Sequence, residues 1–167
     1  VSLDHIVFTE PVVATIHSLE ERNTVRAGDF ALVVGPGPMG LLGAQFAKFR
    51  GAREVAIIGL KRDGLRLEAA RKSGIDHILY SEEHPAERVL ELTDGRGADV
   101  VLEASASSLG VQHAIDSARR ANEGRGGRGR ISFISLWGEP ITLNLDPVSL
   151  NQLDISGAWS WNGPETW

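Results

Sequence analysis

Short apolar runs alternate with longer amphipathic stretches along most of this chain. The apolar runs are rich in Val, Ile and Leu, which predicts strands that are buried on both faces. We expect six strands, at residues 31–34, 55–58, 75–80, 99–103, 130–136 and within 150–159. Helical spacing follows the first strand as far as Arg50 and recurs at 63–72, 84–92 and 109–121. The sequence therefore predicts a doubly wound, parallel six-stranded sheet in a three-layer α/β/α fold.

Apolar residues recur at helical spacing on either side of the first strand. They are Val12, Val13, Ile16 and Leu19 before the first strand, and Met39, Leu42, Phe46 and Phe49 after it. We assign residues 1–28 to a lead-in helix and 29–160 to the α/β domain. Residues 161–167 contain Pro164 followed by Glu165, which is typical of a helix start, and we assign them to the start of a truncated return to a catalytic domain outside this sequence.

The turn after the first strand carries three glycines at the spacing Gly-x-Gly-x-x-Gly. Gly35 permits a tight exit from the strand, Gly37 lets a pyrophosphate approach the backbone, and Gly40 lets the helix pack closely. The helix N-terminus offers free N–H groups to phosphates. The pattern predicts a nucleotide site at Gly35, Gly37, Pro38, Met39 and Gly40. A glycine-rich connection without a ligand is the alternative.

Composition and charge narrow the possible functions. The chain has 167 residues, the size of one domain, and a net charge of −5, which does not suggest nucleic-acid binding. No apolar run is long enough for a membrane span, so we expect a cytoplasmic protein without a membrane partner. There is no cysteine, and the five histidines are scattered without a recognisable catalytic or metal-binding spacing. We therefore expect neither a catalytic residue nor a metal site within this chain.

Three segments together resemble the cofactor domain of the zinc-type medium-chain dehydrogenases, the group of alcohol, sorbitol and threonine dehydrogenases. These segments are Val33–Gly40, Leu67–Gly74 and Asp99–Ser105. Glu10-Pro11 and the stretch 153–161 also match, so that the resemblance covers nearly the whole chain. It implies a Rossmann fold that holds NAD or NADP for hydride transfer to or from a carbonyl group. It also implies a homodimer joined through the last strand.

The resemblance further implies that part of the enzyme lies outside this sequence. In that family the substrate domain is built from chain before and after the cofactor domain, and the usual zinc ligands lie in the N-terminal part. We therefore expect zinc only in the intact enzyme and no activity from this chain alone. Glu10 falls where some members place an acidic zinc ligand, although a charge near a helix start explains it equally well. The sequence departs from the family at one further position, since Ala106 stands where members commonly have a glycine after the fourth strand.

The end of the second strand bears on which dinucleotide is bound. Members of the family that prefer NAD carry an acid there, which accepts hydrogen bonds from the ribose 2′-hydroxyl and repels a 2′-phosphate. Here the position is Gly59, and the cations Lys61 and Arg62 follow. This predicts NADP, with NAD as the alternative if the two cations are solvated loop charges. We expect Asp63 to cap the next helix, although it could turn back toward a ribose.

Ser105 and Leu136 follow the fourth and fifth strands, where ligands bind in open α/β sheets, and Glu103 ends the fourth strand. We add Ser105 and Leu136 to the predicted cofactor site. The favoured interpretation is a nicotinamide-dinucleotide-binding domain of an oxidoreductase that acts on a small alcohol or carbonyl substrate. A non-catalytic nucleotide-sensing or assembly module is the main alternative. A methyltransferase fits less well, because it wants an acid near Gly59 to hold the ribose.

Overall fold

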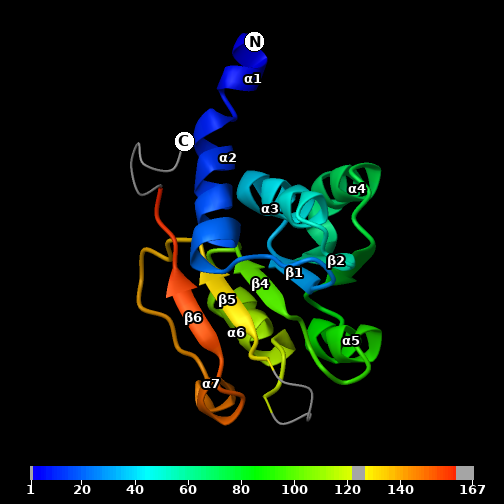
Figure 1. Ribbon diagram of the computed structural model, residues 1–167, viewed down its shortest axis with the longest axis vertical. Helices are drawn as coiled ribbons and strands as arrows, with labels where there is room; N and C mark the ends of the chain where they lie inside the picture. The colour runs from blue at the N-terminus through cyan, green and yellow to red at the C-terminus, as the bar shows by residue number, and fades with distance from the viewer. Residues whose placement is uncertain (1, 122–126, 161–167) are drawn as a thin grey trace.

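A computed structural model describes residues 2–121 and 127–160 of the chain (Figure 1). Its sheet has the strand order β3-β2-β1-β4-β5-β6, and all neighbouring strands are parallel. The strands are β1 (Phe30–Val34), β2 (Glu54–Gly59), β3 (His77–Tyr80), β4 (Val100–Glu103), β5 (Arg130–Phe133) and β6 (Asp154–Gly157). The order reverses between β1 and β4, so the predicted doubly wound parallel sheet is confirmed.

Helices cover both faces of this sheet, which confirms the three layers. The helices are α1 (Leu3–Ile6), α2 (Thr9–Ile16), α3 (Pro38–Phe49), α4 (Gly64–Lys72), α5 (Pro85–Leu92), α6 (Ser108–Ser117) and α7 (Asp146–Leu150), with a π-helical turn η1 (His17–Arg22) and a 3-10 turn η2 (Lys61–Asp63). Alternate side chains of β1 enter two separate cores. Leu32 packs with residues of α5 and α6, whereas Val33 packs with residues of α3 and α4.

The segment before β1 is more broken than the predicted lead-in helix. It consists of α1, α2 and η1, and α1 stands away from the body of the molecule (Figure 1). Of the apolar residues expected on one helix face, Leu19 is buried, whereas Val12, Val13 and Ile16 are only half-buried. The buried side chains include Ala14 and Thr15 of α2 and Ser18 of η1, so smaller residues form much of the inward face. The assignment of 161–167 concerns residues outside the described part.

Helix α3 is confirmed, but the large apolar residues that indicate it do not form the face against the sheet. Phe49 is 83 % exposed, and Met39, Leu42 and Phe46 are only half-buried. The face against the sheet consists of Gly40, Gly43, Ala44 and Ala47. Small residues allow the helix to lie close to the strands, so that a Cβ on Gly43 would stand 2.2 Å from Cδ2 of Leu102. Leu41 and Phe46 pack against the margin of this core, whereas Phe49 at the end of the helix faces away from it.

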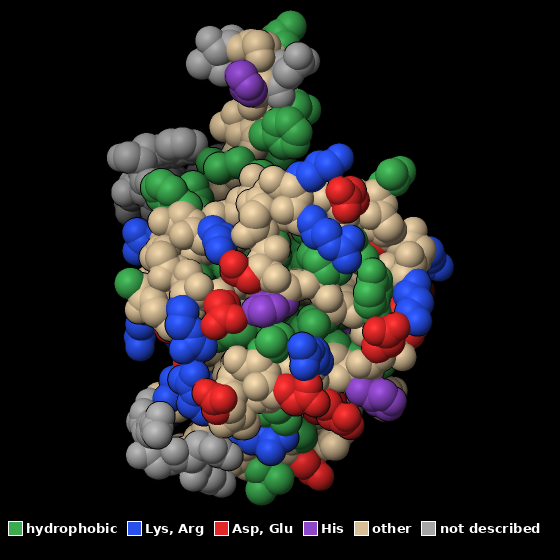
Figure 2. All heavy atoms as spheres, turned by 90° about the vertical axis from the view of Figure 1, so that its right-hand side faces the viewer, with side chains coloured by type: hydrophobic (Ala, Val, Ile, Leu, Met, Phe, Trp, Pro, Cys, Tyr) green, Lys and Arg blue, Asp and Glu red, His purple; other side chains and the backbone are tan. Residues whose placement is uncertain are grey.

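Other elements also differ from the sequence prediction, and β5 ends at Phe133, three residues before the predicted 136. Helix α6 ends at Ser117, well before residue 121, because Ala118 adopts an extended conformation and forms a β-bridge with Ala98. Helix α7 was not predicted, since only five residues between β5 and β6 are helical. None of the helices in the described residues has the length and hydropathy of a membrane span. On the side shown in Figure 2, basic and acidic side chains are interspersed.

Candidate functional site

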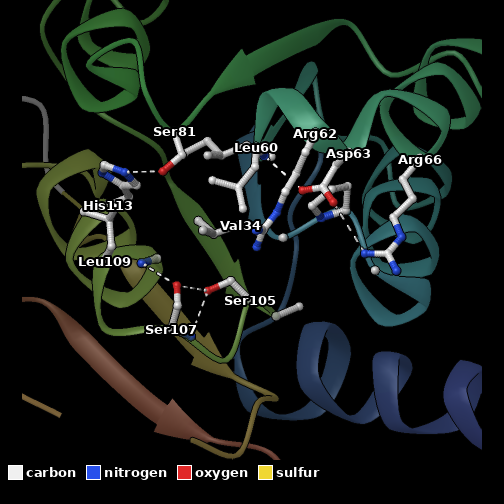
Figure 3. A pocket seen from close by; sticks show the side chains of 17 residues that line it. Val34, Leu60, Arg62, Asp63, Arg66, Ser81, Ser105, Ser107, Leu109 and His113 are labelled. Atoms are coloured by element: carbon white, nitrogen blue, oxygen red, sulfur yellow. Dashed lines mark hydrogen bonds and ion pairs between the residues drawn. The ribbon is translucent and has the colours of Figure 1, made fainter.

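A cavity of about 280 Å³ opens at the carboxyl ends of β1, β2 and β4 (Figure 3). One wall is the turn after β1, with Gly35 and Gly37, and another is the end of β2 at Gly59. Ser105 and His113, from the turn after β4 and from α6, complete the opposite wall. The cavity lies where the strand order reverses, which is the usual ligand position in open α/β sheets.

The three glycines of the turn after β1 serve different purposes. Gly35 has a φ of +102°, and a Cβ there would lie 2.7 Å from the Ala104 carbonyl oxygen. A Cβ on Gly40 would lie 1.8 Å from the Gly35 carbonyl oxygen, so close packing accounts for this glycine. Gly37 is extended (φ −70°, ψ 178°), and a Cβ there would meet nothing within 4 Å. Neither its own backbone nor its neighbours require a glycine at position 37.

The free space at Gly37 faces the cavity at the start of a helix. Gly37 is the N-cap of the twelve-residue helix α3, and its position provides no side-chain cap for the first turn. Uncapped N–H groups and the positive end of the helix dipole favour an anion at such a position. The residues present therefore fit a phosphate that approaches the backbone closely, as the glycine spacing predicts.

The two predicted cations that follow β2, Lys61 and Arg62, differ in their position relative to the cavity. Arg62 lines the cavity and reaches toward its middle (Figure 3), and it has no ion pair with another described residue. Lys61 lies outside the cavity lining, because its ammonium group pairs with Glu83 at 2.7 Å. The hydrogen bond and charge of Glu83 raise the pKa of Lys61. Gly59 has little space for a side chain, since a Cβ would lie 2.8 Å from Cγ of Pro36.

Asp63 occupies the N-cap position of α4, but the prediction that its side chain caps this helix is wrong. Its Oδ2 accepts a hydrogen bond from the Leu60 N–H at 3.0 Å, and its Oδ1 lies 3.5 Å from Nη1 of Arg66. The 3-10 turn η2 precedes α4 and directs the carboxylate back toward β2. Asp63 and Arg66 both line the cavity, and neither belongs to the predicted set of cofactor-binding residues.

The opposite wall contains a pair that the sequence did not indicate. Ser81 follows β3, and its Oγ lies 2.9 Å from Nε2 of His113 on α6. Burial lowers the pKa of His113 below its ordinary value, which favours the neutral ring. The two residues are 32 positions apart, so no local motif could have revealed that they meet.

The cavity thus unites part of the predicted set. Gly35, Gly37, Gly59, Arg62 and Ser105 line it. Pro38, Met39 and Gly40 form the adjoining first turn of α3, and Leu136 is 65 % exposed beyond the end of β5, outside the lining. In the described residues no group of three His, Cys, Asp or Glu side chains could hold a metal ion, and Glu10 is exposed on α2.

The strand order, the glycine turn and the cavity at the reversal point define a Rossmann-type dinucleotide-binding fold. The chain belongs to the zinc-binding dehydrogenase family, which matches residues 38–167. It is 37 % identical to sorbitol dehydrogenase of Halalkalibacterium halodurans and 32 % identical to (R,R)-butanediol dehydrogenase of Neisseria gonorrhoeae. These alignments cover 95 % and 94 % of this chain, but only 44 % and 42 % of the respective relatives.

Solved structures give the same result. An alcohol dehydrogenase from Thermus sp. ATN1 is 26 % identical and superposes with a TM-score of 0.80. The superposition covers 95 % of this chain and 44 % of the enzyme. The chain therefore spans less than half the length of its relatives and corresponds to their nucleotide-binding half.

The turn after β4 contains a strained residue that can be tested. Ala106 has a φ of +55°, and a Cβ makes this left-handed conformation unfavourable by about 1 kcal/mol. Ala106→Gly should raise the free energy of unfolding in urea by about that amount. Ala69→Gly in α4 is the control and should lower it by a similar amount, because glycine destabilises a helix. Equal losses in both variants would contradict the strain.

Proposed function

We propose that this chain binds NADP(H) and orients it within an enzyme that interconverts small alcohols and carbonyl compounds. Residues 29–160 are the cofactor domain, and residues 1–28 connect it to a substrate domain elsewhere in the protein. The relatives named as sorbitol and butanediol dehydrogenases support an alcohol or polyol substrate. The observation that carries the proposal is Gly37, a glycine with no structural need beside a cavity and at a helix N-terminus.

The residues of the cavity have separate roles in this proposal. The bound dinucleotide supplies the hydride chemistry, and the chain binds it and fixes its orientation. The pyrophosphate lies against Gly35 and Gly37 and the first turn of α3, which includes Pro38, Met39 and Gly40. The adenosine ribose lies near Gly59 and Arg62. Ser105 and Leu136 lie beyond the ends of β4 and β5, toward the nicotinamide half.

A side chain at position 37 tests the pyrophosphate site directly. Gly37→Val should weaken NADPH binding at least tenfold, because its side chain would fill the space that the phosphates need. The fold should persist, since a Cβ at this position meets no atom within 4 Å. Calorimetric titration gives the Kd, and circular dichroism checks the fold. Equal NADPH affinity of the variant and the unmodified chain would refute the site.

The preference for NADP rests on the charges at the end of β2. Arg62 has no ion pair with any described residue, so its guanidinium is available to a 2′-phosphate. Arg66 adds a second positive charge beside the cavity. Asp63 opposes a phosphate, but the Leu60 N–H and Arg66 partly neutralise its carboxylate. The position that would carry an acid in a site for NAD is Gly59, where a side chain meets Pro36 and Leu67.

Replacing single cations tests this preference. A charge-assisted hydrogen bond contributes about 1.5–3 kcal/mol, so NADPH should bind about tenfold more tightly than NADH. Arg62→Ala should remove most of this difference and leave NADH affinity nearly unchanged. Lys61→Ala is the matched control and should have little effect, since Lys61 pairs with Glu83. Equal affinities for NADH and NADPH in the unmodified chain at moderate salt would contradict the assignment.

We also propose that two copies pair through β6. This strand is the outer strand of the sheet in the described residues, and an open strand edge favours pairing with another strand. Ile155 on the strand is 37 % exposed and Trp159 just beyond it is 70 % exposed, so an apolar surface accompanies the edge.

Sedimentation velocity tests this pairing. The chain should form dimers at high micromolar concentration, and Ile155→Lys should dissociate them, because a charge on an edge strand opposes pairing. Leu150→Lys changes an exposed apolar residue of α7 and is the control that should remain dimeric. A monomer at every concentration of the unmodified chain would exclude the pairing.

A further inference from the structure

Glu103 is an acid in an unexpected place. It ends β4 in the middle of the sheet, its exposure is 0 %, and its neighbours across the strands are Val34 of β1 and Phe133 of β5. No Lys, Arg or His among the described residues forms an ion pair with it. Its Oε2 has no hydrogen-bond partner in the described part of the chain.

Such an acid does not serve the stability of the fold. Burying a carboxyl group with one unsatisfied oxygen is unfavourable, and an apolar side chain of similar size would pack in the same space without that cost. The reason for the acid must therefore lie in what its other oxygen contacts. That oxygen, Oε1, accepts hydrogen bonds from the N–H of Ser105 at 2.8 Å and from the Ser105 hydroxyl.

A chain of hydrogen bonds continues from Ser105 to α6. The Ser105 Oγ lies 3.1 Å from the Ser107 Oγ and accepts a hydrogen bond from the Ser107 N–H at 3.3 Å. The Ser107 Oγ in turn accepts one from the Gly110 N–H at 3.0 Å, which caps α6. Gly110 is required by this arrangement, because a Cβ there would lie 1.9 Å from the Ser105 Oγ.

The outer members of this chain face the cavity, whereas Glu103 does not. Ser105, Ser107 and Gly110 are among its lining residues, and Figure 3 shows the two serines side by side at its edge. Between the serines lies Ala106 in its left-handed conformation, and its N–H donates to the Ser135 Oγ at 3.2 Å. Hydrogen bonds to Glu103 and Ser135 therefore hold the turn in this unfavourable backbone conformation.

We propose that Glu103 is a positioning residue for the bound dinucleotide. Its carboxyl group fixes the turn 105–107, so that the hydroxyl groups of Ser105 and Ser107 and the start of α6 face the sugar and phosphate oxygens of the ligand. This role rests on the proposed dinucleotide binding. Glu103 itself makes no contact with the ligand and acts through Ser105.

Two substitutions of similar size separate this role from a structural one. Glu103→Gln keeps an oxygen that can accept from Ser105, and it should bind NADPH within about twofold of the unmodified chain. Glu103→Met removes the acceptor and should bind NADPH about tenfold more weakly, because the turn loses its support. Its free energy of unfolding in urea should nevertheless be equal or higher, since the buried carboxyl group is gone.

The opposite signs of these two effects are the test. A residue with a purely structural role would lose stability and NADPH affinity together in Glu103→Met, and that result would overturn the proposal. Unchanged NADPH affinity in Glu103→Met, or a Glu103→Gln variant as weak as Glu103→Met, would also overturn it. Hydrogen exchange at the Gly110 amide gives a readout without ligand and should be faster in Glu103→Met only. Absence of NADPH binding by the unmodified chain would instead refute the proposed function, and the positioning role with it.

Discussion

The close approach of two turns at the carboxyl edge of the sheet determines the shape of the site. The turn after β1 and the turn after β4 lie so near each other that Gly35 has no room for a Cβ against the Ala104 carbonyl. Helix α3 leaves the first turn toward one face of the sheet, and α6 leaves the second toward the other. Because the helices diverge, neither fills the space between the turns, and a cavity remains above β1 and β4. Both helix N-termini border it.

Several polar groups around this cavity are held in place by hydrogen bonds within the turns that follow β2 and β4. Glu103 and Ser107 fix the turn after β4, and the Leu60 N–H holds Asp63 at the end of β2. By contrast, Arg62 projects into open space without such support (Figure 3). In the proposed dinucleotide site, the hydrogen-bonded turns would face the sugar and phosphate groups, and Arg62 and Arg66 would supply positive charge beside them. The ion pair of Lys61 with Glu83 lies on the surface, where such pairs contribute little to stability.

Helix α3 shows where reasoning from the sequence succeeds and where it fails. Its start was predicted from the glycine spacing, and its end near Arg50 is confirmed within a residue. The large apolar residues that indicate the helix do not reveal its packing face, because the helix packs through Gly40, Gly43, Ala44 and Ala47. Hydrophobic periodicity gives weight to large side chains, whereas a helix lying close to a sheet needs small ones. The distance between the two elements decides which rule applies, and no local pattern contains that distance.

The sequence by itself determined the six strands, their parallel arrangement and the glycine turn. Each of these depends on local properties, namely the apolar content of a short run, the alternation of elements and the absence of a side chain. Only the tertiary structure decided that Arg62 faces the cavity while Lys61 turns to Glu83, that Ser81 meets His113, and that Glu103 supports Ser105 from the buried side. These contacts depend on side-chain directions and on segments that come together only when the sheet forms, so they follow from packing across the whole chain.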